Sequence, residues 1–567
     1  MTGAEPDRGL GGDNADVAAP LDSLFIDAAL GPLRRLIPGR AGVRMALSLA
    51  AKPRILARRS ASTAGELTKV AFGRSSLAPG PKDRRFTDAA WAGNPLLRRT
   101  VQTYLATAAL ARELLSDADL GWSDRERMSF VIDNLIEALS PSNAPLANPA
   151  ALKAALDTGG RSYLRGAVNF ARDMSLPPRV PSMVDRDAFN VGSDLAVTPG
   201  QVVLRTDTFE LIQYAAQTEQ VRQLPMLLVP PTINKYYIAD LAPDRSMVEY
   251  FVQSGQQVFL MSWRNPGADH ADWGLDTYVQ AVLDAMDAVE GICQVDQSIL
   301  FSLCAGGIIS SLLLGHLIDT GQEGRLAGFA LGVTLLDQSR AGLMSSVTSP
   351  QLVAVATAKS ARMGYLDGRS LAEVFAWLRP GDLIWNYWVN NYLLGKSPPA
   401  FDVLYWNADT TRLTAGLHAD FMRLAIDNAL VEGTATALGS PVDLSKATVD
   451  SYVIAGIADH ICPWVSCYRS AQLFGGRTRF VLSTSGHIAA LVNPPGNEKS
   501  NYRVGEDIPD DPQTFLAEAT REQGTWWQDF ARWLAEHAGE DRPAPMEAGD
   551  AEHPPLTPAP GTYVFAT

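Results

Sequence analysis

Residues 298–318 read SILFSLCAGGIISSLLLGHLI and are the most informative segment for the fold class. It contains no Asp, Glu, Lys or Arg, and its length matches that of a membrane-spanning helix. The small residues CAGG in its middle instead predict a tight turn, because they let the backbone fold back without steric conflict. This turn would divide the stretch into a short buried strand, 298–303, and a buried helix, 306–318. We therefore expect a strand, a turn and a helix here rather than a membrane span.

Cys304 stands at this turn, where G-x-S-x-G nucleophile elbows place their catalytic residue. Cysteine replaces the usual serine, and Ser302 replaces the first glycine, so the backbone there has to accommodate a hydroxymethyl group. The helix that follows would direct backbone N–H groups and the positive end of its dipole toward the thiol, which favours the thiolate. A buried structural cysteine is the alternative, since free cysteines are among the most buried residues. The hexapeptide 302–307 alone does not decide between them.

Two further strand ends carry the residues that would complete a catalytic triad. Asp459 follows the apolar run 450–456, and His487 follows the run 479–484. The order nucleophile, acid, base is that of the α/β hydrolases, and open α/β sheets build their sites at the carboxyl ends of strands. His487 would accept the thiol proton, while Asp459 would orient the imidazole ring and stabilise its charged form. His460 is the rival base, and the alternative for it is a polar loop residue.

The rest of the chain predicts an α/β-hydrolase core with helical additions. From residue 191 onward, short apolar runs alternate with helical stretches, which is the pattern of a mostly parallel sheet. No further strand is evident over about 338–446, a segment rich in Trp, Tyr and Asn that we expect to be an inserted helical cap. The other predicted core elements are strands 225–230, 257–263 and 326–336 and helix 276–292.

Before residue 191 the apolar residues repeat at intervals of three and four, which predicts helices such as 94–115 and 125–139. Proline-rich joints interrupt this helical region, and one of them precedes the first strands. The expected domains are a disordered N-terminus (1–20), a helical N-terminal domain (21–190), a catalytic domain (191–540) and a loose C-terminal tail (541–567).

Weaker candidates surround the triad. The oxyanion hole would take one backbone N–H from Ala305 and a second from Ile233, on the loop that follows strand 225–230. Arg264 follows strand 257–263 and would hold a phosphate or, more simply, a surface carboxylate. The sequence has neither a GxxxxGK[ST] phosphate loop nor an HExxH zinc motif, so we expect no metal and no cofactor.

Composition places the chain among ordinary enzymes, since 46% of its 567 residues are hydrophobic and 19% are charged. The formal net charge of −14 gives no general electrostatic footprint for nucleic acid. The first residues are acidic and glycine-rich, unlike a signal peptide, so we expect a cytoplasmic protein. Cysteines at 293, 304, 462 and 467 form no CxxC pair, and we expect free thiols.

Several long motifs carry a resemblance to a known family. They are PPTINKYYIADL (230–241), SWRNP (262–266), SLCAGGI (302–308), IWNYWVNNYLLG (384–395), LYWNADTTRL (404–413), AGIADHICPW (455–464) and SGHIAALVNPPGN (485–497). With these motifs, the chain resembles the polyhydroxyalkanoate synthases, bacterial enzymes that make a storage polyester, from about Gly73 to its C-terminal helix. The single-subunit enzymes of this family form class I and class II, and these motifs are most similar to those of class II. Class II enzymes use medium-chain monomers.

The resemblance implies an acyltransferase that polymerises (R)-3-hydroxyacyl-CoA and releases CoA, without a cofactor. The family's nucleophile, acid and base lie in segments that match Cys304, Asp459 and His487, and the growing chain is carried as an acyl-cysteine. The resemblance also implies a cytoplasmic homodimer that associates with the polyester granule and has no transmembrane segment.

Two alternatives stay open. A cysteine-dependent hydrolase of thioesters or lactones would use the same triad and oxyanion hole. A granule-coating protein with a degenerate hydrolase fold would use neither.

If Cys304 lies in an elbow, replacing Ser302 with glycine is expected to leave activity intact or higher.

Overall fold

The computed structural model describes residues 21–31, 36–81, 83–175, 177–338, 350–459, 461–505 and 508–567. The chain forms two compact units, each built from separate stretches of sequence. The first comprises Met1–Ala29, Arg186–Gly368 and Asp402–Thr567, and the second comprises Leu30–Asp185 and Arg369–Phe401. The segment expected as a cap, 338–446, thus contributes to both units. Residues 1–20, which were expected to be disordered, lie outside the described part of the chain.

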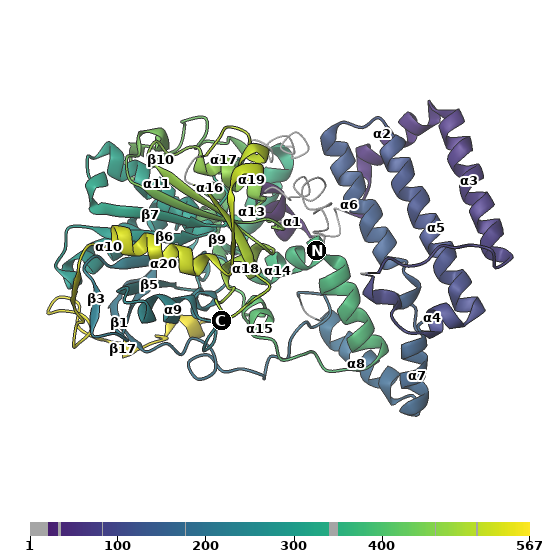
Figure 1. Ribbon diagram of the computed structural model, residues 1–567, viewed down its shortest axis with the longest axis horizontal. Helices are drawn as coiled ribbons and strands as arrows, with labels where there is room; N and C mark the ends of the chain where they lie inside the picture. The colour runs from purple at the N-terminus through teal and green to yellow at the C-terminus, as the bar shows by residue number, and fades with distance from the viewer. Residues whose placement is uncertain are drawn as a thin grey trace, which may run out of the picture. The chain divides into compact units, whose positions relative to one another are not determined.

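An eleven-stranded sheet forms the centre of the first unit (Figure 1). Its strands lie in the order β15-β14-β13-β12-β7-β6-β4-β5-β2-β1-β17, and the six from β13 to β5 run parallel to one another. Strands buried on both faces appear in a sequence as continuous apolar runs, which is why all six were predictable. They are β4 (Met226–Val229), β5 (Val258–Trp263), β6 (Ser298–Leu303), β7 (Leu326–Gly332), β12 (Ser451–Gly456) and β13 (Thr478–Ser483).

Helices pack against this sheet. The segment 298–318 is divided as expected, into β6 and α11 (Ala305–Asp319), and α10 (Leu275–Cys293) packs beside α11. Aromatic rings join the sheet to α20 (Trp526–His537), where the ring of Phe530 lies 4.8 Å from that of Phe301 on β6. Within the described residues, no helix combines the length and the apolar character needed to cross a bilayer.

Both edges of the sheet are antiparallel, and the sequence does not reveal the strands that form them. On one side β2 (Phe209–Tyr214) pairs with β5, and β1 (Gly200–Arg205) pairs with β2. On the other side β14 (Asn501–Gly505) pairs with β13, and β15 (Thr520–Gln523) pairs with β14. The β15 side chains are exposed throughout, so this strand lacks the apolar pattern on which prediction depends.

The segment after residue 540 is not loose, so that expectation was wrong. It forms β16 (Asp541–Pro543), which pairs with β3 (Gln220–Arg222), and β17 (Thr557–Pro558), which pairs with β1. Just after β17, the backbone N–H of Thr562 donates a hydrogen bond to the side chain of Glu210 on β2, at 2.8 Å. Both strand pairings join backbone groups more than 300 residues apart along the chain, and composition gives no signal for partners so distant.

The second unit is helical over its described residues, which confirms the expected helical N-terminal region. Asn94 caps α5, because its side chain accepts hydrogen bonds from two backbone N–H groups and Pro95 follows at the first helical position. Trp91, Tyr104 and Met128 belong to the buried core of this unit. Its longer helices are α2 (Gly39–Ala50), α3 (Pro53–Ala71), α5 (Pro95–Asp117), α6 (Trp122–Ala138), α7 (Pro149–Asp157) and α8 (Arg161–Ser175).

The described part of the expected cap is mostly helical. Its strands are two residues long and pair only with each other, outside the central sheet. The pairs are β8 (Tyr365–Leu366) with β9 (Leu413–Thr414) and β10 (Thr436–Ala437) with β11 (Ser440–Pro441). Two π-helical turns, Gly381–Trp385 and Trp388–Leu393, carry several of its aromatic residues. The α-helices here are α13 (Pro350–Met363), α14 (Gly368–Leu378), α15 (Asp402–Ala408) and α16 (Ala415–Ile426).

Candidate active site

Cys304 occupies the turn between β6 and α11. Its backbone angles, φ 50° and ψ −118°, fall in a region that residues other than glycine seldom adopt. A conformation of this kind persists only where the surrounding structure enforces it, and it clusters at functional residues. The side chain is half-buried and its thiol is free. The turn expected at CAGG therefore has the strained geometry of a nucleophile elbow.

The two glycines of the elbow allow neighbouring segments to approach closely. A Cβ atom on Gly306 would lie 2.5 Å from the backbone oxygen of Pro230, just beyond β4. A Cβ atom on Gly307 would lie 2.1 Å from Oγ1 of Thr334. Neither position therefore has room for a side chain unless a neighbour moves. As a result, the end of β4 lies directly against the N-terminus of α11.

Ser302, which replaces the first glycine of the elbow, is fully buried. Its hydroxyl donates a hydrogen bond to Oγ of Ser310 on α11, at 2.7 Å. A buried hydroxyl without a partner would cost free energy, and here the helix that follows the elbow supplies the partner. The serine is thus accommodated, and it ties β6 to α11.

Replacing Ser302 with glycine is expected to lower the free energy of unfolding by about 1–3 kcal/mol, since Ser310 loses its partner and glycine loosens the unfolded chain. The double variant Ser302→Gly/Ser310→Ala removes both hydroxyl groups and should recover part of this loss. Urea denaturation of the single and double variants measures the coupling. Strictly additive losses would contradict the role given to the hydrogen bond.

Asp459 lies on the loop that follows β12, and His487 is the first residue of α18 (His487–Leu491), the short helix after the neighbouring strand β13. Nδ1 of His487 donates a hydrogen bond to Oδ2 of Asp459 at 2.7 Å. The second carboxylate oxygen, Oδ1, accepts the backbone N–H groups of Ile461 and Cys462 at 2.8 and 2.9 Å. The carboxylate is completely buried, so these bonds fix its orientation. The imidazole is thereby held with Nδ1 on the carboxylate, which leaves Nε2 for another partner.

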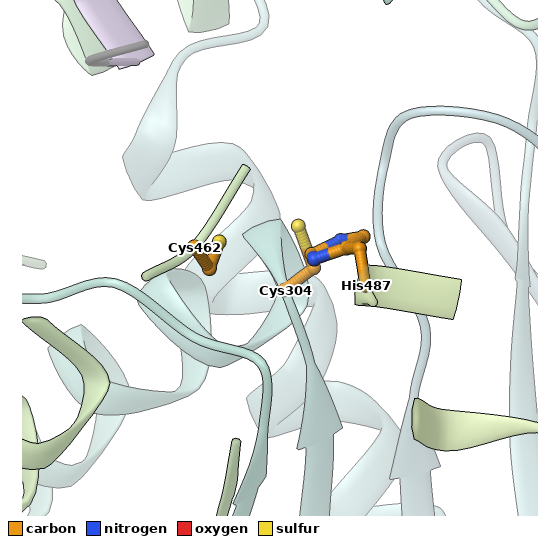
Figure 2. A group of neighbouring side chains, drawn as sticks. All are labelled: Cys304, Cys462 and His487. Carbon is orange, nitrogen blue, oxygen red and sulfur yellow. The ribbon is translucent and has the colours of Figure 1, made fainter. Parts of the chain in front are cut away.

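That partner is the thiol of the elbow. Figure 2 shows Cys304, Cys462 and His487 gathered at one point, and their sulfur and nitrogen atoms all lie within 4.8 Å of one another. The structure therefore brings the expected nucleophile, acid and base together. It also adds Cys462, which sequence reasoning missed. The only signal for Cys462 was its position three residues after Asp459, on the loop that carries the acid.

The electrostatics of this group favour a thiolate on Cys304. A hydrogen bond from Cys462 holds the pKa of Cys304 well below its ordinary value against the effect of burial, and the charge of His487 and the Ala305 backbone N–H add to this. Burial lowers the pKa of His487, but its interactions with Asp459 and the thiolate raise it to about 10. The pKa of Cys462 is raised well above its ordinary value by its bond to Cys304 and by burial. These directions favour a thiolate on Cys304 beside an imidazolium on His487, with the Cys462 thiol as the hydrogen-bond donor.

The weaker candidates are placed differently. The N–H of Ala305 faces the Cys304 sulfur, as an oxyanion donor next to the nucleophile should. Ile233 lies on the loop after β4, the segment that Gly306 allows close to the elbow. Arg264 instead donates a hydrogen bond to the Tyr563 hydroxyl at 2.6 Å and lies over the Tyr563 ring. His460 lies outside the described residues. The catalytic roles of all four stay predictions.

Comparisons with known proteins agree with this fold. Residues 225–494 match the family model of the alpha/beta hydrolase fold, which confirms the expected fold class. Residues 82–251 match the model described as Poly-beta-hydroxybutyrate polymerase (PhaC) N-terminus.

Curated relatives extend over most of the chain. Poly(3-hydroxyalkanoate) polymerase 1 of Ectopseudomonas oleovorans is 45% identical over 88% of this chain and 89% of its own length. Polymerase 2 of the same organism is 44% identical, over 88% and 90%. Poly(3-hydroxyalkanoate) polymerase subunit PhaC of Cupriavidus necator is 39% identical, over 86% and 84%. Similarity of this extent shows common family membership.

Proposed function

Because this chain belongs to the poly(3-hydroxyalkanoate) polymerases, we propose that it joins (R)-3-hydroxyacyl units from their CoA thioesters into polyester, with Cys304 as the acyl carrier. The enzyme is thus an acyltransferase. The observation that carries the assignment of the site is the position of Cys304, at a strained elbow beside a histidine that Asp459 orients. The relatives that are 44–45% identical to this chain are named polymerases, which favours the polymerase over the hydrolase and the granule-coating protein.

In the first proposed step the Cys304 thiolate attacks the carbonyl carbon of the hydroxyacyl-CoA thioester. The carbonyl oxygen becomes an oxyanion, which the Ala305 N–H and, as predicted, the Ile233 N–H would stabilise. When the carbonyl re-forms, the bond to the CoA sulfur breaks, and the CoA thiolate takes the proton of the His487 imidazolium. The products are acyl-Cys304, free CoA and a neutral His487.

In the second step the 3-hydroxyl of another hydroxyacyl unit attacks acyl-Cys304. Neutral His487 accepts the hydroxyl proton, an ester bond forms, and the Cys304 thiolate leaves beside a restored imidazolium. A thioester is exchanged for a thioester in the first step and for an ester in the second. A thiolate suits this cycle because it attacks readily and also leaves readily, whereas an acyl-serine would be a deeper trap.

We infer the cofactor requirement, the oligomeric state and the cellular location of the enzyme from the same family membership. The CoA thioester is substrate and CoA is product, so the proposed cycle uses no cofactor. The expected homodimer, the cytoplasmic location and the association with the polyester granule belong to this proposal. Exposed apolar side chains on α7 and α8 support contact with a hydrophobic polymer, since Leu156 is 82% exposed and Leu164 is 70% exposed.

Incubation with 3-hydroxybutyryl-CoA and with 3-hydroxydecanoyl-CoA tests the proposed function. We expect CoA release together with insoluble polyester from at least one substrate, and no release above background from the Cys304→Ala variant. The comparison of the two substrates also gives the preferred monomer length. Release of CoA with only soluble 3-hydroxy acid would instead favour the hydrolase.

A further inference from the structure

The cluster at the elbow holds one more soft ligand than acyl transfer requires. The proposed cycle uses the sulfur of Cys304 and the imidazole of His487, yet the sulfur of Cys462 lies within 4.8 Å of both (Figure 2). Cys462 is buried, and it lies on the short loop that connects Asp459 to α17 (Trp464–Ala471). Two thiols and an imidazole that converge on one point make up a familiar ligand set for zinc.

The dimensions of the cluster fit this ion. Zinc binds thiolate sulfur at about 2.3 Å and imidazole nitrogen at about 2.0–2.1 Å, so the ligand atoms of a tetrahedral site lie roughly 3.5–3.8 Å apart. The atoms of Cys304, Cys462 and His487 start no more than 4.8 Å from one another. They therefore have to close by at most about 1.0–1.3 Å, which changes in side-chain torsion can supply. Three protein ligands also leave the fourth position open to water.

The partners of the ligands fit as well. Zinc-binding histidines almost always donate their second ring N–H to a carboxylate or carbonyl group, which orients the ring. His487 does so already, through the 2.7 Å bond to Asp459. The same carboxylate accepts the backbone N–H of Cys462 at 2.9 Å, so it fixes the segments that carry two of the three ligands. No sequence motif predicts this site, because its ligands come from three separate segments: the elbow turn, the loop before α17 and the N-terminus of α18.

We propose that Cys304, Cys462 and His487 form a binding site for Zn²⁺, and that bound zinc reversibly blocks acyl transfer. The Cys462 thiol and the His487 imidazolium each lose one proton to the buffer, two sulfur–zinc bonds and one nitrogen–zinc bond form, and no electrons are transferred. The block follows because zinc occupies both the nucleophile and the base. This part rests on the function proposed above, whereas binding itself does not.

The test uses the full chain, metal-free buffer and zinc chloride, and it measures protection of Cys304 from iodoacetamide by mass spectrometry. We expect zinc to protect Cys304, and the concentration for half-protection to rise at least about tenfold in Cys462→Val, the scale on which even outer partners of a ligand change affinity. Cys467→Val is the matched control, because Cys467 is also buried and contacts the carbonyl oxygen of Cys462 at 3.6 Å but is outside the cluster. It should behave like the unmodified chain.

The proposal would be overturned if zinc did not protect Cys304, or if the zinc concentration for half-protection were the same in Cys462→Val and the unmodified chain. If circular dichroism shows that Cys462→Val is unfolded, Cys462→Ser decides, since serine keeps the size and hydrogen bonding but binds zinc poorly. Cobalt substitution adds a second readout, because thiolate ligands give charge-transfer absorption that should weaken in the Cys462 variants. A chelator should restore CoA release. A chain that never releases CoA would refute the proposed function and leave the binding result intact.

Discussion

Cys304→Ala is expected to lower the rate of CoA release from a 3-hydroxyacyl-CoA by at least about 10³-fold, the scale on which loss of a triad nucleophile acts. The reason is chemical, since alanine offers no atom that can form the acyl-enzyme bond. The variant should still fold, because Cys304 is half-buried and removal of one sulfur atom leaves little cavity. Release of CoA, followed with a thiol-reactive dye, measures the loss.

Two matched variants separate this prediction from general effects of removing thiols. Cys293→Ala deletes a buried thiol whose pKa burial raises to about 12, so it should leave the rate of CoA release within about twofold of the unmodified chain. Cys304→Ser keeps a nucleophilic atom, but a hydroxyl ionises far less readily than a thiol, so we expect a loss almost as large as with alanine. If Cys304→Ala kept its activity, both the triad and the proposed mechanism would be wrong.

The centre of the fold could be predicted because its signals are local. Each of the six parallel strands is buried on both faces, so each appears as an apolar run that needs no knowledge of its neighbours. The expected site depended on the same logic. Cys304, Asp459 and His487 each follow such a run, and parallel strands bring their carboxyl ends to one edge of the sheet. The bond between Asp459 and His487 agrees with that reasoning.

The antiparallel edges and the C-terminal segment could not be predicted, because their stability comes from partners distant in sequence. β17 is only two residues long, and it is defined by its pairing with β1 and not by its own composition. The aromatic segment expected as part of a cap presents a similar limit. Residues 369–401 belong to the compact unit of the N-terminal helices, so chain order does not reveal which unit an insertion joins.

Ser302 and Cys462 show a third limit, which concerns single side chains. Ser302 departs from the elbow pattern, and the hydrogen bond to Ser310 that accommodates its hydroxyl could not be predicted from the motif. Nothing in the spacing of Cys462 suggested a role, yet the loop between Asp459 and α17 brings its sulfur to the nucleophile. Such side-chain contacts depend on the conformation of a few residues between two elements. They leave no periodic pattern in the sequence from which they could be predicted.

His487→Gln is expected to reduce CoA release by about 10²–10⁴-fold, because it removes the base and the positive charge beside the thiolate. Glutamine is close in size and keeps an amide that can reach Asp459, so the carboxylate need not lose its partner. The charge effect can be measured apart from turnover, as the rate at which iodoacetamide alkylates Cys304 at different pH values. Only the thiolate reacts, so the rate rises as pH passes the pKa of Cys304.

In the unmodified chain this rise should occur well below the ordinary thiol pKa, because Cys462, His487 and the Ala305 N–H all stabilise the thiolate. Without the imidazolium, burial should prevail and move the midpoint upward by about 1–3 pH units. Turnover in the unmodified chain should fall again above about pH 10, where His487 loses the proton that it gives to the leaving CoA. That upper limit should be absent in His487→Gln. An alkylation midpoint that stays unchanged in this variant would show that His487 does not stabilise the nucleophile, whatever happens to turnover.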